Sequence, residues 1–333
     1  MSFKAIVVSE SLDGKFTREI ADRELEDLPQ GDVLIRVNYS SLNYKDALSA
    51  NGNKGITKSY PHTPGIDAAG IVEISRHESV SVGEQVIVTG FDLGMNTPGG
   101  FAEFVRVPAS WIMNKPENYT LKESMIFGTA GFTAAAALYK MSLMGLDPSA
   151  GPIVVTGSTG GVGSIAVALL AKAGYEVIAV TGKENSHEYL EFLGAKQVAG
   201  RDFVDDKSLK QLLAPRWAGA IDTVGGNTLS TLLRSCQPEG CVVSTGLVGS
   251  ATLNTTVFPF ILNGVSLLGI GSAEMPMETR KLIWKKLDTD WSIQNKLSTI
   301  GKEVSLETLN ESCINAILEG SITGRIVVAM KDK

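Results

Sequence analysis

The chain has 333 residues, of which 44% are hydrophobic and 20% are charged, and its net charge at pH 7 is −6. This composition indicates an ordered globular protein that is long enough for two domains, each with its own core. The acidic balance counts against a surface for nucleic acid or anionic lipid, because both need an excess of basic residues. We therefore expect no nucleic-acid partner and no membrane partner.

Residues 1–125 form a region rich in predicted strands. Short apolar or alternating runs separated by turns are typical of strands, and such runs occupy residues 4–8, 32–37, 69–74, 85–88 and 101–107. The first run soon turns polar, which fits neither the core of a signal peptide nor a membrane span. The sequence therefore predicts a cytoplasmic protein.

From about residue 121 the pattern changes to one of alternating helices and strands. An alanine-rich helix is expected over residues 131–141, and the expected strands that follow are residues 153–156, 176–180, 197–199, 219–222, 241–244 and 266–270. Alternation of this kind predicts a parallel sheet, whose ligands bind at the carboxyl ends of its strands. Segments 222–225, 245–247 and 271–272 should then border a cofactor. A last strand, over residues 324–329, is assigned back to the β-rich region.

The first strand of this sheet leads into a glycine-rich turn and then into an apolar helix over residues 164–173. The turn consists of Gly157, Ser158, Thr159, Gly160, Gly161, Val162 and Gly163. Glycines at 157, 160 and 163 have the spacing that lets backbone N–H groups approach a pyrophosphate at a helix N-terminus. A lone glycine triplet can also mark a structural turn. The order of strand, turn, helix and second strand within about 30 residues favours dinucleotide binding.

The second strand ends in Thr181, Gly182 and Lys183. A site that prefers NAD usually has an acid here, which binds the ribose 2′-hydroxyl. A hydroxyl, a glycine and a cation suit a 2′-phosphate instead, so we expect NADPH as the cofactor. Two alternatives stay open: Glu184, one residue further on, could reach a ribose, and Lys183 could be a solvated surface lysine.

The cysteines and histidines predict neither a disulfide framework nor a metal site. The three cysteines show no paired spacing, and structural zinc sites generally need four ligands. The residues concerned are Cys236, Cys241, Cys313, His62, His77 and His187. We therefore expect no metal.

Three further segments carry a resemblance to a known superfamily. Residues 41–46 (SLNYKD) look like its Asn-x-x-Asp segment, residues 64–70 (PGIDAAG) occupy the place of its Gly-His-Glu-x-x-Gly segment, and residues 128–134 (GTAGFTA) are similar to its Gly-Thr-x-Gly-x-Thr-Ala helix start. With these motifs the chain resembles the medium-chain dehydrogenase/reductase superfamily over essentially its whole length. The resemblance implies an α/β fold: a Rossmann-type doubly wound parallel sheet that binds NADPH over residues 126–272, and a GroES-like β-rich catalytic domain over residues 1–125 and 273–333.

The chain departs from the zinc alcohol dehydrogenases of that superfamily. They have histidine and glutamate where this chain has Ile66 and Asp67, and they carry a four-cysteine lobe that is absent here. The chain therefore resembles the zinc-free branch, and residues 40–48 and 217–225 closely resemble bacterial acrylyl-CoA reductases, proteins also labelled quinone oxidoreductases. By this resemblance, the residues that contact NADPH include Tyr44, Thr159 to Val162, Thr181 to Lys183, Arg201, Leu247 and Ser272. Thr129, at a helix start, is assigned to the cofactor as well, although threonine there is also a common cap.

Reduction of an activated C=C bond needs a hydride for the β-carbon, a stabilised enolate oxygen and a proton for the α-carbon, and no metal is required. We take Tyr44 and Asn43 as catalytic candidates, because a preorganised donor on this segment can serve the oxyanion. In the alternative interpretation Asn43 caps a helix that begins near Tyr44, and Tyr44 is an aromatic shelf for the nicotinamide. Asp46 and Asp67 are assigned to local structure, and Arg201 either binds a phosphate or pairs with a nearby aspartate.

The sequence thus predicts an NADPH-dependent reductase of a short α,β-unsaturated acyl-CoA, with acrylyl-CoA as the first substrate to test. NADPH:quinone oxidoreductase activity stays open, since it needs the same reduced coenzyme. A non-enzymatic RNA-binding or structural role is a third hypothesis, and the acidic charge counts against it. The apolar edge expected at residues 266–270, together with the superfamily resemblance, predicts a homodimer.

Overall fold

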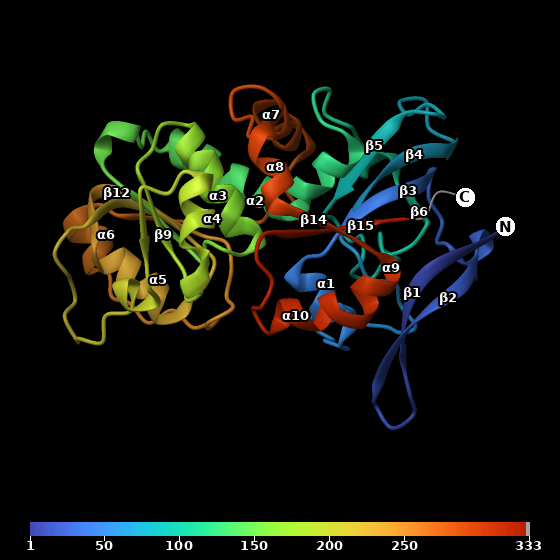
Figure 1. The fold of residues 1–333 in the computed structure, drawn as a ribbon, viewed down its shortest axis with the longest axis horizontal. Coiled ribbons are helices and arrows are strands. Elements are labelled where there is room, and N and C mark those ends of the chain that lie inside the picture. Colours follow the sequence, from blue (N-terminus) through green and yellow to red (C-terminus); the bar gives the residue numbers. More distant parts are fainter. Residues whose placement is uncertain (331–333) are drawn as a thin grey trace. The chain divides into compact units, whose positions relative to one another are not determined.

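The computed structural model describes residues 1–330, and the chain divides into two compact units (Figure 1). Unit 1 comprises Met1–Thr129, Ala273–Asp288 and the residues from Leu297 onward, and unit 2 comprises Ala130–Ser272 and Thr289–Lys296. These units differ from the predicted domain limits at residues 126–129 and 289–296.

Unit 1 is built on a seven-stranded sheet. Its strands are β3 (Val33–Ser41), β4 (Asp67–Ser75), β5 (Gln85–Thr89), β6 (Phe104–Val107), β7 (Met113–Asn114), β14 (Gly301–Ser305) and β15 (Arg325–Ala329). The order is β14-β15-β3-β4-β5-β7, and β6 pairs with β3. The expected last strand is therefore present as β15, and it pairs antiparallel with β3 in the β-rich unit. A hairpin of β1 (Ser2–Glu10) and β2 (Phe16–Glu24) adds a second sheet.

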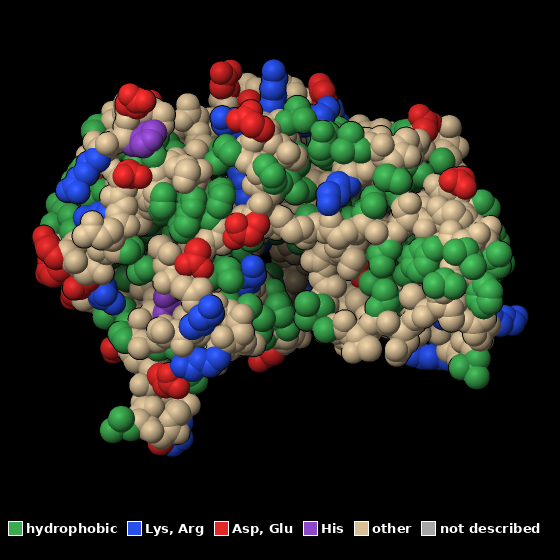
Figure 2. Space-filling view, turned by 180° about the vertical axis from the view of Figure 1, so that it is seen from behind, with side chains coloured by type: hydrophobic (Ala, Val, Ile, Leu, Met, Phe, Trp, Pro, Cys, Tyr) green, Lys and Arg blue, Asp and Glu red, His purple; other side chains and the backbone are tan. Residues whose placement is uncertain are grey.

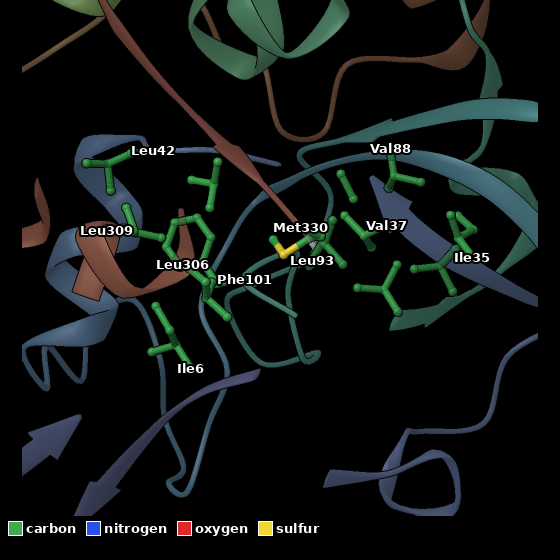
Figure 3. Close-up of a cluster of buried hydrophobic side chains, with 14 of the residues drawn as sticks. Ile6, Ile35, Val37, Leu42, Val88, Leu93, Phe101, Leu306, Leu309 and Met330 are labelled. Carbon is green, nitrogen blue, oxygen red and sulfur yellow. The ribbon is translucent and has the colours of Figure 1, made fainter. Parts of the chain in front are cut away.

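The core of unit 1 lies between the sheet and the C-terminal helical segment (Figure 3). Figure 3 shows Ile35, Val37 and Val88 on the strands, and Leu306 and Leu309 on the segment that contains α9 (Leu306–Thr308). The other helices of this part of the chain are α1 (Tyr44–Ala50), α7 (Met277–Asp288), α8 (Gln294–Ile300) and α10 (Ile314–Leu318). Most residues of β3, β4, β5, β6 and β15 are buried, whereas the edge strand β14 has one buried residue.

The helix α2 (Leu121–Leu143) is longer than the expected helix over residues 131–141 and is interrupted within it. Gly128 has φ +48° and ψ −153°, which is a non-helical conformation that glycine adopts at low cost. The sequence expectation thus captured only the second part of the helix. The interruption aims the N–H of the next residue, Thr129, away from the helix axis, which matters for the site described below.

Unit 2 is a six-stranded parallel sheet of order β10-β9-β8-β11-β12-β13. Its strands are β8 (Ile153–Thr156), β9 (Val177–Val180), β10 (Gln197–Ala199), β11 (Trp217–Asp222), β12 (Cys236–Ser244) and β13 (Ser266–Gly269). The strand order reverses direction beside β8, which is the topology of a doubly wound dinucleotide-binding sheet. The predicted Rossmann-type sheet is therefore confirmed, although β12 begins at Cys236 rather than at residue 241.

Helices follow the strands of unit 2 in alternation. They are α3 (Gly161–Lys172), α4 (His187–Leu193), α5 (Gly226–Arg234) and α6 (Phe258–Asn263). Right-handed crossovers on the two sides of β8 place α3 and α4 on one face and α5 and α6 on the other, as Figure 1 shows. Among the helices of residues 1–330, none combines the length and the apolar character needed to cross a membrane.

Candidate functional site

The glycine turn of unit 2 is as tight as its sequence predicts. Gly157 follows β8 with φ +56°, and a Cβ there would stand 2.2 Å from Thr223 Oγ1. At Gly163 a Cβ would stand 2.2 Å from the carbonyl oxygen of Gly157. Gly160 precedes α3 as its N-cap and has more room, because its Cβ would lie 3.3 Å from the same oxygen. Gly157 is therefore required by its positive φ and by the Thr223 hydroxyl beside it, and Gly163 by the close approach of the backbone.

The turn presents the N-terminus of α3, a helix of 12 residues. Within residues 1–330, no protein group accepts a hydrogen bond from the N–H groups of Gly161, Val162 and Gly163. Free N–H groups at a helix N-terminus attract an anion through both hydrogen bonding and the helix dipole. This arrangement has the donor chemistry for a pyrophosphate.

A second turn, after β9, is bonded to the first. Ser158 donates from its hydroxyl to the carbonyl oxygen of Val180 over 2.9 Å, and the hydroxyls of Thr159 and Thr181 lie 3.3 Å apart. Thr181 Oγ1 also accepts from the N–H of Lys183 over 3.1 Å. The structure thus brings the glycine turn and residues 181–183 together at the carboxyl ends of neighbouring strands.

Arg201 adds a second cation beside Lys183. A Cβ on Gly182 would lie 2.3 Å from Arg201 Nε, so the guanidinium packs directly over this glycine. Asp205, an aspartate four residues further along the chain, forms an ion pair with Lys207 over 2.6 Å. Burial lowers the pKa of Lys183 from its ordinary value, and Glu184 is exposed at the start of a short 3₁₀ helix. Cations and a hydroxyl therefore gather where a 2′-phosphate would bind.

The other two predicted contact residues of unit 2, Leu247 and Ser272, lie in loops that follow β12 and β13. Ser272 is half-buried at the last residue before the chain returns to unit 1. Leu247 is 61% exposed and helps to line an open pocket of about 280 Å³ at the ends of β11 and β12. Their assignment to the cofactor remains a prediction.

Asp222 at the end of β11 has a larger structural part than the sequence indicated. Its buried carboxylate accepts from Thr156 Oγ1 over 2.6 Å and from the N–H of Gly225 over 2.7 Å. Burial raises the pKa of Asp222. The side chain therefore joins the end of β8 to the loop after β11, which lines the pocket. An acid as the last residue of a buried strand was the available sequence signal for Asp222.

Unit 1 contains the remaining candidates, and Asn43 is the most constrained of them. It is the N-cap of α1, where its own N–H donates to Asp46 Oδ2 over 2.8 Å. Its side-chain amide donates to Asp67 Oδ2 over 2.7 Å and to Asp46 Oδ2 over 3.2 Å. The structural interpretations of Asp46 as a cap and of Asp67 as part of a local network agree with these contacts.

Tyr44, the first residue of α1, is 37% exposed, and its hydroxyl has no hydrogen-bond partner within residues 1–330. Thr129 differs, since its hydroxyl donates to Asp67 Oδ1 over 2.6 Å and its N–H lies 2.9 Å from the same oxygen. The buried Arg325, which the sequence analysis did not single out, donates to Asn43 Oδ1 over 3.1 Å. A lone arginine at the start of a strand offered no sequence signal for this contact.

Possible metal ligands do not gather in the described part of the chain. Among residues 1–330, no group of three or more His, Cys, Asp or Glu side chains is placed to hold a metal ion. Ile66 is buried. It occupies the position at which, by the resemblance described above, the zinc alcohol dehydrogenases have a histidine.

Comparisons with known proteins agree with both halves of this architecture. Residues 29–117 match the family described as "Alcohol dehydrogenase GroES-like domain", and residues 161–288 match the family described as "Zinc-binding dehydrogenase". The GroES-like fold predicted for the β-rich domain is thereby confirmed. The second name belongs to the family as a whole and assigns no metal to this chain.

Individual relatives are similar over nearly the whole length. The acrylyl-CoA reductase AcuI of Ruegeria pomeroyi is 40% identical over 327 residues, which is 98% of each chain. A crystal structure of the YhdH oxidoreductase from Salmonella enterica in complex with NADP has a TM-score of 0.95 at 40% identity and covers 99% of this chain and 100% of that one. Bacillus subtilis YhfP with NAD bound has the same TM-score at 42% identity, with coverage of 99% and 100%. The chain belongs to the medium-chain dehydrogenase/reductase family of oxidoreductases.

Proposed function

We propose that this protein uses NADPH to reduce the activated C=C bond of a short α,β-unsaturated acyl-CoA, with acrylyl-CoA converted to propionyl-CoA as the best single assignment. The observation that carries the proposal is the paired turn of unit 2, where free N–H groups of α3 stand beside Lys183 and Arg201. The acrylyl-CoA reductase relative, 40% identical over 98% of both chains, supports the substrate class.

The preference for NADPH follows from the residues after β9. The pyrophosphate of the coenzyme would bind the N–H groups of residues 161–163, and its 2′-phosphate would bind Lys183, Arg201 and the Thr181 hydroxyl. The tight turn at Gly157 and Gly163, which has no room for a Cβ at either residue, supports this placement because it brings β8 directly to the N-terminus of α3. Relatives differ in the coenzyme found with them, since Salmonella YhdH was solved with NADP and Bacillus YhfP with NAD. The cations of this chain favour the phosphorylated form.

When bound, NADPH supplies the hydride that the β-carbon receives. Negative charge then develops on the thioester oxygen, and a preorganised donor lowers the free energy of that transition state. Tyr44 is our candidate for this donor because its hydroxyl is accessible and bonds to no protein group within residues 1–330. Its aromatic ring would serve as packing surface in addition.

Asn43 is assigned a positioning role rather than direct contact with the oxyanion. Its side-chain amide already donates to Asp46 and Asp67, and the residue is 7% exposed. A donor committed to two carboxylates has little capacity for a third acceptor.

Quinone reduction is the second candidate function. Bacillus subtilis YhfP, 44% identical over 92% of both chains, carries the provisional name of a quinone oxidoreductase. A quinone accepts the same hydride but offers a flat ring in place of a thioester chain. The residues of unit 2 that bind the coenzyme would be the same for both substrates, so only turnover separates them.

We also propose that the protein is a homodimer in the cytoplasm. The edge strand β13 and the neighbouring helix α6 expose a group of apolar side chains: Val257, Phe258, Ile261, Leu262 and Leu267. Figure 2 shows hydrophobic side chains gathered on this end of unit 2, at the right of the view. Pairing of two such edges would cover both the strand and the apolar group. Three unpaired cysteines, Cys236, Cys241 and Cys313, fit a reducing compartment.

Oxidation of NADPH with a panel of acrylyl-CoA, crotonyl-CoA and quinones tests this proposal. We expect turnover with acrylyl-CoA at a kcat/KM well above that for any quinone, and chelators should leave it unchanged because no metal takes part. Faster turnover of a quinone would favour the second candidate. Activity lost on chelation and restored by zinc would contradict the proposed mechanism.

A further inference from the structure

A single buried carboxylate, Asp67, accepts hydrogen bonds from the two chain segments of unit 1 that contain candidate site residues. We propose that Asp67 is a positioning residue for the reaction, which acts through Asn43 on Tyr44 and acts directly on Thr129. The inference rests on the proposed function, because it takes Tyr44 as the hydrogen-bond donor to the substrate. The inference adds a physical reason why the Tyr44 hydroxyl would be held in a fixed position.

The contacts of Asp67 saturate both of its carboxylate oxygens. Oδ2 accepts from Ser41 Oγ over 2.6 Å and from Asn43 Nδ2 over 2.7 Å. Oδ1 accepts from Thr129 Oγ1 over 2.6 Å and from its N–H over 2.9 Å. The side chain is 0% exposed, so water does not compete with these donors for the carboxylate oxygens. A buried carboxylate with this many donors fixes their relative positions closely.

Asn43 transmits the position of Asp67 to the start of α1. Its amide group lies between two carboxylates, Asp67 at 2.7 Å and Asp46 at 3.2 Å, and Asp46 also receives the N–H of Asn43 over 2.8 Å. Asp46 Oδ1 accepts a hydrogen bond from the N–H of Ile66 over 2.8 Å. Ile66 is the residue directly before Asp67 in the chain. Because Asn43 is the N-cap of α1 and Tyr44 is its first residue, a shift of Asp67 moves the backbone of Tyr44.

Arg325 supplies the positive charge of this group through Ser41. Its Nη2 donates to Ser41 Oγ over 2.7 Å, and the same hydroxyl donates to Asp67 Oδ2. The direct separation of Arg325 Nη2 and Asp67 Oδ2 is 3.7 Å. Two further bonds, from Nη1 to the carbonyl oxygen of Leu42 and from Nε to that of Ile126, orient the guanidinium. The charges are therefore fixed by hydrogen bonds on all sides, as a buried pair requires.

Gly128 gives independent support, because its missing side chain makes room for this network. A Cβ there would stand 2.5 Å from Asp67 Oδ2, 2.6 Å from Ser41 Oγ and 2.9 Å from Arg325 Nη2. Its φ of +48° turns the chain so that the next N–H, that of Thr129, reaches Asp67. The 23-residue helix α2 is thus interrupted at Gly128, the residue beside which the Asp67 carboxylate lies.

Variants Ser41→Ala and Asp67→Asn test the inference, because both side chains are fully buried and act only through the groups that they bind. Each removes a bond to the carboxylate or its charge, and a misplacement of about 1 Å at a reacting group costs on the order of 100-fold in rate. We expect kcat with acrylyl-CoA to fall about 10-fold to 100-fold, which is a larger change than that in the Kd for NADPH, because the proposed phosphate contacts of the coenzyme lie in unit 2. Ser41→Ala is the milder change and keeps the test usable if Asp67→Asn does not fold.

The matched control is Asp206→Asn in unit 2, which breaks the ion pair of Asp206 with the buried Arg234, 3.1 Å apart. This variant should lower the free energy of unfolding and leave kcat unchanged. If the hydrogen bonds of Asp67 serve stability alone, Ser41→Ala and Asp67→Asn should behave like this control, with a lower free energy of unfolding and an unchanged kcat. That result would overturn the inference.

A double-mutant cycle tests whether Asp67 acts through Tyr44. If it does, Asp67→Asn should slow the Tyr44→Phe variant by a smaller factor than it slows the unmodified protein, because residues in one network are not additive. Effects that multiply would contradict the inference.

If the unmodified protein turns over neither enoyl-CoA nor quinone, the proposed function fails, and amide hydrogen exchange decides the positioning separately. Asp67→Asn should then speed exchange in residues 43–50 and 129–133 together, whereas faster exchange in one segment alone would overturn the inference.

Discussion

The guanidinium of Arg201 covers the backbone of Gly182, where an added Cβ would stand 2.3 Å from Arg201 Nε. No other amino acid than glycine fits at this step without moving the arginine. The next residue is Lys183, so the glycine brings two cations to one turn at the carboxyl end of β9. Because Arg201 follows β10 in the chain, this pairing of cations depends on the parallel sheet and not on sequence proximity.

Lys183→Ala should weaken NADPH binding far more than NADH binding. Loss of one charge-assisted hydrogen bond to a phosphate costs about 1.5 to 3 kcal/mol, or roughly 10-fold to 100-fold in Kd. Titration of the two reduced coenzymes by fluorescence measures the difference. Lys207→Ala is the control, since that lysine pairs with Asp205 and should change neither affinity. Equal affinities for NADPH and NADH in the unmodified protein would refute the coenzyme assignment.

Gly163→Ala should destabilise unit 2. Its Cβ would overlap the carbonyl oxygen of Gly157 at 2.2 Å, and overpacking of this kind costs about 1 to 3 kcal/mol. Gly160→Ala is the matched control, because the nearest atom lies 3.3 Å away and φ is −78°. Denaturant unfolding of both variants gives the comparison. Equal stabilities would mean that the turn is looser than described.

The pH dependence of the free energy of unfolding should show the raised pKa of Asp46. Burial, and then the neighbouring charge of Asp67, raise the pKa of Asp46 to about 7, while Arg325 is the cation that faces the pair. An acid whose pKa is raised on folding contributes stability that is complete below its unfolded pKa of about 3.9 and is lost as the pH rises through the folded value. The free energy of unfolding, relative to that of Asp46→Asn, should therefore fall between about pH 4 and pH 7 and level off above it. A difference that stays constant over this range would contradict the prediction.

Ile261→Glu should dissociate the proposed dimer. This side chain is 68% exposed on α6 in the apolar group beside β13, and burial of an unpaired charge in an interface is strongly unfavourable. Light scattering at micromolar concentration should report a dimer for the unmodified protein and a monomer for the variant. Leu209→Glu, at a residue 94% exposed outside that group, should remain dimeric. A monomer mass for the unmodified protein would exclude the proposal.

The sequence predicted unit 2 better than unit 1 because its signals are local. The strands and the glycine turn follow one another within a short stretch, and β8 has the expected limits. By contrast β2 is charged along its length, with Arg18, Glu19 and Asp22 among its residues, and was not expected. The start of β12 at Cys236 was not predicted either. Pro238 and Glu239 lie within the strand, and neither residue type is typical of a strand; Glu239 also has φ +60°.

The contacts of the candidate site were predictable only in part. A helix beginning at Tyr44 with Asn43 as its cap follows from residues within one turn of each other. The bonds from Thr129 and Arg325 to the segment around Asp67 join residues far apart in the chain, and no local pattern contains them. The interruption at Gly128 belongs to the same class, because the side chains that exclude a Cβ there come from β3, β4 and β15.

The most direct test of the account is the reaction of acrylyl-CoA with NADPH that carries deuterium at the transferred position of its nicotinamide ring, followed by mass spectrometry of the product. The account predicts propionyl-CoA with one deuterium on the β-carbon, formed faster than the same coenzyme is oxidised by any quinone tested. Propionyl-CoA without deuterium, or oxidation of NADPH by quinones alone, would contradict it.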